Sequence, residues 1–129
     1  MRVLLDTHAW LWMLTEPERL GDALAIVEDA RNELLLSAAS SWEIAIKYTL
    51  GRLPLPEPPA AYVPARIAST GVTPLAVEHS HALAVAELPD HHRDPFDRIL
   101  VAQAVLEAVP IVSGDQALAR YEVEVIRPG

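Results

Sequence analysis

Three short apolar runs in this chain are each followed by an acidic residue near the start of a helical pattern. The runs, each with its acid, are Val3–Leu5 with Asp6, Leu34–Leu36 with Glu43, and Ile111–Val112 with Asp115. A fourth acid, Asp97, opens a helical pattern after a loop. Strands that alternate with helices predict a parallel sheet with helices on both faces. The carboxyl ends of such strands share one edge, where ligands bind, so we expect the four acids to meet there.

Four carboxylates at one sheet edge would repel one another. Two unit charges roughly 4 Å apart cost about 4 kcal/mol at an effective dielectric constant of about 20. A divalent cation relieves this repulsion, because Mg²⁺ and Mn²⁺ take carboxylate oxygens and water as ligands. The pattern therefore predicts a Mg²⁺ or Mn²⁺ site, in which the catalytic and metal-binding residues are Asp6, Glu43, Asp97 and Asp115.

The composition limits what kind of protein this is. A chain of 129 residues that is 51% hydrophobic is expected to form one domain over residues 1–129. It has no cysteines, which excludes disulfides and thiolate zinc sites and fits a reducing compartment, so we expect a cytoplasmic protein. No signal peptide pattern or membrane-length apolar run is present, and no membrane contact is expected. The net charge of −8 argues against binding nucleic acid by bulk charge. It does not exclude a nuclease, because acids that bind metal ions are partly neutralised.

The expected elements alternate along the chain. Strands are predicted at residues 2–5, 34–37, 73–76, 110–113 and 123–126, the last at a sheet edge. Helices are predicted at residues 8–14, 22–32, 41–50, 59–69, 78–87 and 96–108, with a helical turn at 115–120. Four prolines between positions 54 and 59 predict a stiff extended connector rather than a domain boundary.

Each acid also has a structural interpretation. Glu43 stands three residues after a serine, which is the spacing of a capping box. Asp94 precedes a proline, as a helix N-cap does, and this leaves Asp97 in a first turn where the helix dipole favours an acid. Asp6 and Asp115 could likewise cap the helices that follow them. Singly, capping is the more frequent role; together, convergence on one edge favours a functional site, and only Asp94 keeps the capping interpretation.

Five stretches carry a motif pattern that spans essentially the whole chain. They are Asp6–Trp12, Ser37–Lys47, Gly51–Pro56, His92–Gln103 and Ser113–Asp115. In order and spacing they resemble the PIN-domain ribonucleases of the VapC toxin type. The resemblance implies a three-layer α/β/α fold with a central parallel sheet of about five strands. It also implies a four-acid site, here Asp6, Glu43, Asp97 and Asp115, and Mg²⁺- or Mn²⁺-dependent endoribonuclease activity on RNA. A cognate antitoxin that inhibits the toxin, and a homodimer, are the partners it implies.

Further residues are assigned by position. Arg93 and Arg98 flank the entry to the Asp97 helix, and our hypothesis is that one of them contacts RNA phosphate. The neighbouring residues His91 and His92 lie in a polar loop, where histidines are more often solvated than bound to metal. Ser113 is expected to bond the backbone of a turn, more readily than to hold a metal-bound water.

The tryptophans divide into two groups. Trp10 and Trp12 are two residues apart and cannot share a helix face, so we expect one of them to be partly exposed. Our hypothesis is that the exposed one lines an apolar groove for an antitoxin helix or a dimer mate. Trp42 and Phe96 are expected in the core.

Two alternatives to the nuclease remain open from the sequence. A PIN-like domain can keep its acids and serve as a protein-interaction or regulatory module with little nuclease activity. A phosphoacceptor receiver domain also places acids and Mg²⁺ at such an edge. Receivers use adjacent acids after the first strand and a later lysine, whereas Asp6 stands alone and Lys47 is the only lysine here. An acyl-phosphate donor would separate the receiver from the nuclease.

Overall fold

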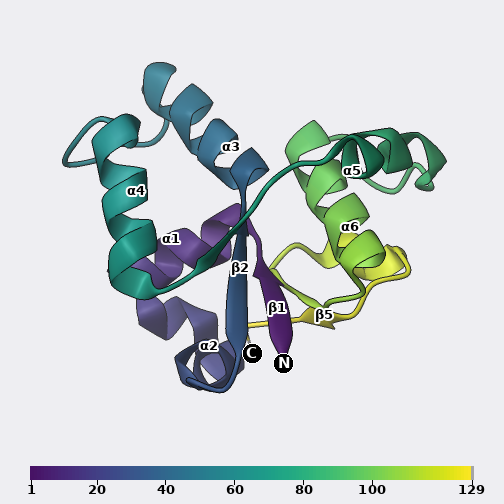
Figure 1. Cartoon of the computed structure of the whole chain (residues 1–129), viewed down its shortest axis with the longest axis horizontal. Helices are drawn as coiled ribbons and strands as arrows, with labels where there is room; N and C mark the ends of the chain where they lie inside the picture. Colours follow the sequence, from purple (N-terminus) through teal and green to yellow (C-terminus); the bar gives the residue numbers. More distant parts are fainter. Residues whose placement is uncertain (129) are drawn as a thin grey trace.

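A five-stranded parallel sheet forms the centre of the protein in the computed structural model, which describes residues 1–128 (Figure 1). The strands are β1 (Arg2–Leu5), β2 (Glu33–Ser37), β3 (Thr73–Leu75), β4 (Ile111–Val112) and β5 (Val125–Ile126). They lie in the order β3-β2-β1-β4-β5, and each neighbouring pair is parallel. The predicted parallel sheet of about five strands is confirmed, and the last strand lies at an edge. Gly129, the last residue of the predicted domain, lies outside the described residues.

Helices cover both faces of this sheet. The α-helices are α1 (Thr7–Thr15), α2 (Leu24–Glu28), α3 (Ala38–Thr49), α4 (Pro59–Thr70), α5 (His79–Ala84) and α6 (Pro95–Glu107). Shorter 3-10 helices are η1 (Pro17–Ala23), η2 (Val85–Glu87) and η3 (Gln116–Arg120). Figure 1 shows α1, α2 and α4 on one side of β1 and β2, with α6 on the other, so the three-layer prediction is confirmed. Across residues 1–128, no helix has the length and apolar character that crossing a membrane requires.

The core divides into two layers, because side chains along a strand alternate between the two faces of a sheet. On one face, Val3 and Leu5 pack in the same cluster as Trp10 of α1. On the opposite face, Leu4 packs in the same cluster as Leu100 of α6. The three β1 residues are fully buried. Since β1 is covered on both faces, its apolar run is continuous, as is usual in a buried parallel strand.

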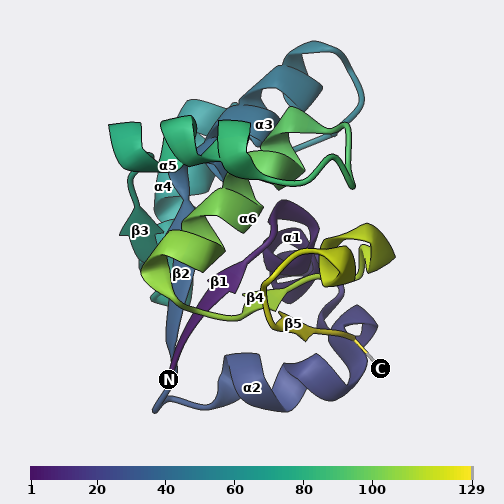
Figure 2. The same cartoon turned by 90° about the vertical axis from the view of Figure 1, so that its right-hand side faces the viewer.

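Strands β1 and β2 run toward the edge at which α1 and α3 begin (Figure 2). Helix α3 starts three residues earlier than predicted, directly after β2, with the Ser37 hydroxyl accepting a hydrogen bond from the Ala39 N–H at 3.0 Å. Glu43 therefore lies in the second turn of α3 rather than at its third position. The capping-box interpretation of Glu43 is wrong, and its side chain is free for another role.

The helix predicted over residues 22–32 is broken into shorter pieces. Gly21 has φ of 51° and ψ of −126°, which interrupts the helical backbone within η1 before α2 begins. After α2, the Asp29 carboxylate accepts a hydrogen bond from the Arg31 N–H at 3.0 Å. Aspartate side chains that bond the backbone two residues onward favour turns over helix, so the helical pattern stops there.

Candidate metal centre

Asp6 stands where β1 ends and α1 begins, and it is almost completely buried. Its Oδ1 accepts a hydrogen bond from the Ala9 N–H at 2.7 Å, so the capping role considered for this acid is present. Burial raises the pKa of Asp6, and the hydrogen bonds from Ser113 and Ala9 offset this only in part. A cation would stabilise the charged form of a carboxylate that is held away from solvent. Capping and metal binding are therefore compatible roles for Asp6.

Glu43 is buried on the inner face of α3 with two defined partners. Its Oε1 accepts a hydrogen bond from the Thr7 hydroxyl at 2.6 Å, and its Oε2 pairs with Lys47 Nζ at 2.6 Å. Thr7 follows Asp6 directly, so the first turn of α1 ties the second acid to the first. Lys47 supplies local positive charge beside a buried carboxylate, as buried charges require.

Asp97 and Asp115 meet at the side chain of His92. The His92 Nε2 lies 2.7 Å from Asp115 Oδ2 and 3.1 Å from Asp97 Oδ2. Asp97 lies in the first turn of α6, whose N-cap is Asp94, as predicted. Asp115 follows β4 and caps η3, with Oδ1 accepting from the Ala117 N–H at 2.9 Å. The loop histidine expected to be solvated is therefore a member of the acid cluster, and that prediction is wrong.

The two aspartates have opposite pKa shifts. Burial raises the pKa of Asp97 to about 7, and the charge of Asp94 adds to the rise, against the opposing effect of His92. Burial also acts to raise the pKa of Asp115, but hydrogen bonds from Ala117 and His92 outweigh it and the pKa lies below its ordinary value. Perturbed carboxylates in one cluster are typical of functional sites.

His92 is itself held by the loop that carries it. Burial lowers the pKa of His92, but the hydrogen bond to Asp115 and the charges of Asp97 and Asp115 raise it to a net value above the ordinary one. Its Nδ1 accepts a hydrogen bond from the Asp94 N–H at 3.0 Å. Nδ1 can accept this bond only when the imidazole is neutral, so the bond opposes the rise in the pKa of His92.

The structure clusters two of the four predicted acids, Asp97 and Asp115. One ligand atom from each of His92, Asp97 and Asp115 lies within 4.8 Å of the others. Asp6 and Glu43 lie outside that set, but the charge of Glu43 raises the pKa of both Asp6 and Asp97. The donors are mainly carboxylate oxygens that share excess negative charge, and this set fits a hard divalent cation such as Mg²⁺ or Mn²⁺.

Comparison with known proteins identifies the family. The family model of the PIN domain matches residues 3–124. The chain belongs to the PIN-domain family. Over 64 residues it is 56% identical to Ribonuclease VapC16 of Mycobacterium tuberculosis, a match covering 50% of this chain and only 45% of that relative. Ribonuclease VapC22 of the same organism is 30% identical over 122 residues, 92% of this chain and 91% of that protein. The second match places this PIN domain among the VapC-type proteins and confirms the resemblance seen in the sequence.

Solved structures give the same fold. In the crystal structure of VapBC2 from Rickettsia felis bound to a DNA fragment from their promoter, the matched chain has a TM-score of 0.72 at 12% identity. The match covers 98% of this chain and 98% of that one. At this low identity the likeness concerns the fold alone, and it shows that the whole described PIN domain shares that architecture.

The arginines proposed to contact RNA occupy different surroundings. Arg98 donates hydrogen bonds to the Val85 carbonyl at 3.0 Å and to the Pro89 carbonyl at 3.1 Å. It also lies 3.3 Å from the Tyr121 hydroxyl. Its guanidinium therefore anchors the loop that carries His92. Arg93 is exposed at the tip of the same loop.

The exposure of the tryptophans agrees with the prediction for Trp10 and Trp12 and disagrees with it for Trp42. Trp10 is fully buried and Trp12 is partly exposed, so the prediction that the pair differs in exposure is confirmed. Trp42 is 62% exposed and packs edge-on against Phe96 with 5.0 Å between ring centroids. The prediction that Trp42 lies in the core is wrong, because Glu43 and its neighbours on α3 take the inner face and leave Trp42 outside.

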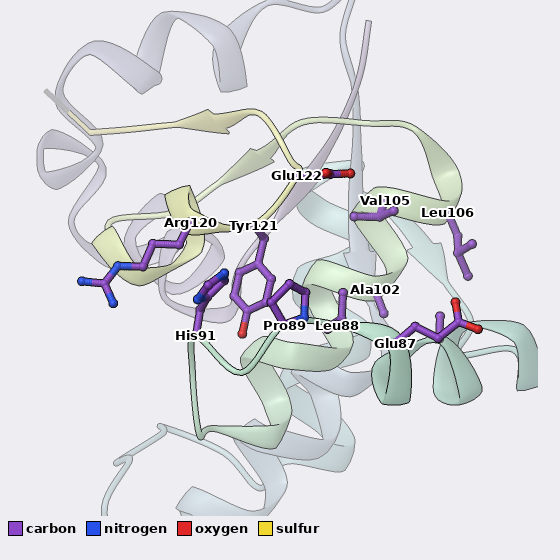
Figure 3. A pocket seen from close by; sticks show the side chains of 11 residues that line it. Glu87, Leu88, Pro89, His91, Ala102, Val105, Leu106, Arg120, Tyr121 and Glu122 are labelled. Carbon is purple, nitrogen blue, oxygen red and sulfur yellow. The ribbon is translucent and has the colours of Figure 1, made fainter.

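A cavity of about 520 Å³ lies on the other side of the histidine loop (Figure 3). His91 lines it and packs edge-on against Tyr121, with 5.0 Å between ring centroids. None of the four acids lines this cavity. Adjacent residues of one loop thus lie in two environments, with His91 toward the cavity and His92 toward the acids.

Several residues of the site were missed in the sequence. Lys47 follows Glu43 by four residues on a helix, which is the spacing of an ion pair, and this signal was available. Thr7 and His92 carry no such signal, because their contacts join segments 36 and 23 residues apart. Ser113 bonds the Asp115 N–H at 3.0 Å, so the turn role expected for it is confirmed.

Proposed function

We propose that this PIN domain is a metal-dependent endoribonuclease, the toxin of a VapBC-type toxin–antitoxin pair, and that its site holds Mg²⁺ or Mn²⁺. The observation that carries the proposal is the group of buried and half-buried acids at the carboxyl edge of the sheet, including Asp97 with its pKa raised to about 7. The ribonuclease names of its VapC relatives support the reaction. The proposed catalytic and metal-binding residues are Asp6, Glu43, Asp97 and Asp115.

Each acid has a distinct task in this proposal. Asp6 accepts hydrogen bonds from the Ala9 N–H and from Ser113, and the remaining lone pairs of its carboxylate would bind the cation. Asp97 and Asp115 present carboxylate oxygens close to each other from the first turn of α6 and from the end of β4. Thr7 and Lys47 fix the orientation of Glu43. A bound divalent cation supplies an activated water for in-line attack and neutralises charge on the scissile phosphate. The chain then needs no nucleophilic side chain.

The activity is tested with purified, antitoxin-free protein and a pool of structured RNA, in the presence of Mg²⁺, Mn²⁺ or EDTA. The wild type is expected to cut with metal and not with EDTA, and Asp6→Asn is expected to lose cutting while its unfolding transition persists. Cleavage by a clean Asp6→Asn preparation would contradict the assigned role. A folded protein that binds Mn²⁺ and cuts no RNA would favour the alternative, a protein-interaction or regulatory module with little nuclease activity.

Arg93 is the better of the two candidates for RNA phosphate. Arg93 is exposed and directly follows His92 in the chain, whereas the guanidinium of Arg98 donates to backbone carbonyls of the protein. Arg93→Ala is expected to lower RNA affinity and to reduce the slope of affinity against salt by about one. Arg98→Ala serves as the comparison, with its main effect on the unfolding free energy. An unchanged salt slope in Arg93→Ala would contradict the proposal that Arg93 contacts RNA phosphate.

An apolar stripe on the outer face of α3 supports the homodimer. Trp42 and Leu50, both about 60% exposed, lie on it with Ile46 between them. Their spacing of four residues places them along one side of the helix, next to the buried face that carries Glu43. We propose that a second copy covers this stripe. Trp42→Ser is expected to convert the dimer to a monomer in sedimentation analysis, and a wild type that is monomeric at high concentration would contradict this.

The antitoxin is proposed to bind on the α1 side of the molecule. Trp12 is partly exposed there and its ring lies under the guanidinium of Arg19, 4.7 Å from the ring centroid. Such an aromatic surface suits the apolar face of a partner helix. Trp12→Ala is expected to weaken binding of the cognate antitoxin while Trp42→Ser leaves it unchanged, and equal effects of both would remove Trp12 from the interface.

We also propose that residues 1–129 work as one domain in the cytoplasm. The five strands that form the single sheet extend from residue 2 to residue 126, which supports one domain. The lack of cysteines supports a reducing compartment.

A further inference from the structure

The histidine loop places an N–H donor between two of the proposed metal ligands. His92 Nε2 is 2.7 Å from Asp115 Oδ2 and 3.1 Å from Asp97 Oδ2. One carboxylate oxygen from each aspartate and one ring nitrogen of His92 lie within 4.8 Å of one another. A cation bound by both aspartates would occupy this same space, so the position of His92 matters for metal binding.

The hydrogen bonds of the ring decide which nitrogen carries the proton. The Asp94 N–H donates to His92 Nδ1 at 3.0 Å, so Nδ1 is an acceptor and has no proton. A neutral imidazole then carries its proton on Nε2, the atom that faces Asp97 and Asp115. His92 therefore donates a hydrogen bond to Asp115 Oδ2, and the same N–H lies 3.1 Å from Asp97 Oδ2, where its dipole offsets part of the repulsion between the two carboxylates.

The same bond argues against His92 as a metal ligand. A histidine that binds metal through Nε2 carries its proton on Nδ1 and usually donates it to a carboxylate or a backbone carbonyl. Here the partner of Nδ1 is the N–H of Asp94, which can only donate. Binding a cation through Nε2 would place two N–H groups against each other at Nδ1, and the loop would have to rearrange.

The loop is also well anchored in this position. Arg98 donates to the Val85 and Pro89 carbonyls, and these bonds hold the chain just before His92. Asp94 follows His92 by two residues and caps α6 by accepting from the Phe96 N–H at 2.9 Å. Both ends of the short segment that carries His92 are therefore fixed to helices, and the imidazole has a defined place.

We infer that His92 is a competitor of the metal, which holds Asp97 and Asp115 together in the metal-free protein and must turn away before a cation can bridge them. The inference rests on the metal centre of the proposed function and adds a control on its loading. The hydrogen bonds of His92 stabilise only the unloaded state. The toxin thus fills its site at a higher metal concentration than its four acids alone would require.

The test is Mn²⁺ binding without RNA, followed by the electron paramagnetic resonance signal of free Mn²⁺. Loss of hydrogen bonds to charged groups from the unloaded state predicts that His92→Ala binds Mn²⁺ about tenfold more tightly than the wild type. His92→Gln keeps an N–H donor at nearly the same reach and is expected to lie between the two. His91→Ala is the matched control, since His91 contacts Tyr121 instead of the acids, and it is expected to bind Mn²⁺ like the wild type.

The outcomes separate this inference from the metal centre itself. Unchanged or weaker Mn²⁺ binding by His92→Ala would overturn the inference, while loss of binding in Asp97→Asn would preserve the centre. If neither the wild type nor His92→Ala bound Mn²⁺ in the millimolar range, both the inference and the metal part of the proposed function would fail.

A measurement on the wild type keeps the inference testable if His92→Ala does not fold. Nitrogen-15 NMR of labelled histidine reports which ring nitrogen carries the proton. The His92 proton is expected on Nε2 without metal and to stay there when diamagnetic Mg²⁺ is added, with a change in the Nε2 hydrogen bond. A switch of the proton to Nδ1 on adding Mg²⁺ would show that Nε2 binds the cation, and the competitor role would be wrong.

Discussion

Replacing Asp97 by asparagine should stabilise the metal-free protein. The Asp97 carboxyl is mostly buried, with 21% of the side chain exposed, and it lies among Asp94, Asp115 and Glu43. Asparagine has nearly the same shape and no charge. The substitution therefore removes a poorly solvated negative charge from the cluster while keeping the packing of the first turn of α6.

The magnitude follows from the pKa of Asp97, which rises from 3.8 to about 7 on folding. The folded state holds the Asp97 proton more tightly than the unfolded state does. The free energy of unfolding therefore falls as the pH rises from 3.8 to about 7, and it stays low at higher pH. About three pKa units correspond to roughly 4 kcal/mol as an upper limit. Solvent screening and the lost contact with His92 reduce this, so we expect Asp97→Asn to gain about 2 kcal/mol at about pH 8.

Urea denaturation with EDTA present measures this gain. The advantage of Asp97→Asn over the wild type should shrink as the pH falls toward about 5, where folded Asp97 is protonated. Asp115→Asn is the opposing control, because the pKa of Asp115 is lowered on folding and its charge stabilises the protein at neutral pH. A variant Asp97→Asn that is less stable than the wild type at about pH 8, or a gain that does not vary with pH, would refute the reasoning.

Two further predictions concern stability. Lys47→Met leaves buried Glu43 without its counter-ion, so the free energy of unfolding in EDTA should fall by about 2 kcal/mol, a value already discounted for the partly exposed lysine. Added Mn²⁺ should restore part of this loss. An unchanged free energy of unfolding in urea would contradict the prediction. Gly71→Ala should lower the free energy of unfolding by about 1 kcal/mol in the same assay, because residue 71 has φ of 74°. No atom lies within 4 Å of an added Cβ, so backbone strain is the only cost. A stabilised variant would count against a left-handed residue there.

The sequence was sufficient to predict the parallel sheet and to place Asp6 and Asp115 just after strands β1 and β4. Apolar runs such as Val3–Leu5 are local signals, and their burial on both faces follows from the alternation with helices. Capping signals were also local, and Asp94 occupies the N-cap of α6 as its position before a proline predicted. The start of α3 was placed too late because β2 runs directly into the helix, with no loop to mark the boundary.

The parts that failed depend on contacts between distant segments. His92 was assigned to solvent because a polar loop was its only visible context, and its partner Asp115 lies 23 residues away. Trp42 was assigned to the core by its chemistry, but the inner face of α3 is taken by Glu43, which bonds Thr7 and Lys47 there. A polar residue therefore occupies the buried face and the neighbouring tryptophan is exposed, which simple hydrophobic patterning does not predict.

The most direct test of the account is the position of a bound metal. Crystals of the wild type soaked in Mn²⁺ would be measured for anomalous scattering, with Asp6→Asn crystals beside them. We predict a peak at the carboxyl edge of the sheet, among Asp6, Glu43, Asp97 and Asp115, and its loss in Asp6→Asn. A peak elsewhere, or none at the acid cluster in crystals that remain intact, would contradict the assignment of these four acids as a metal centre.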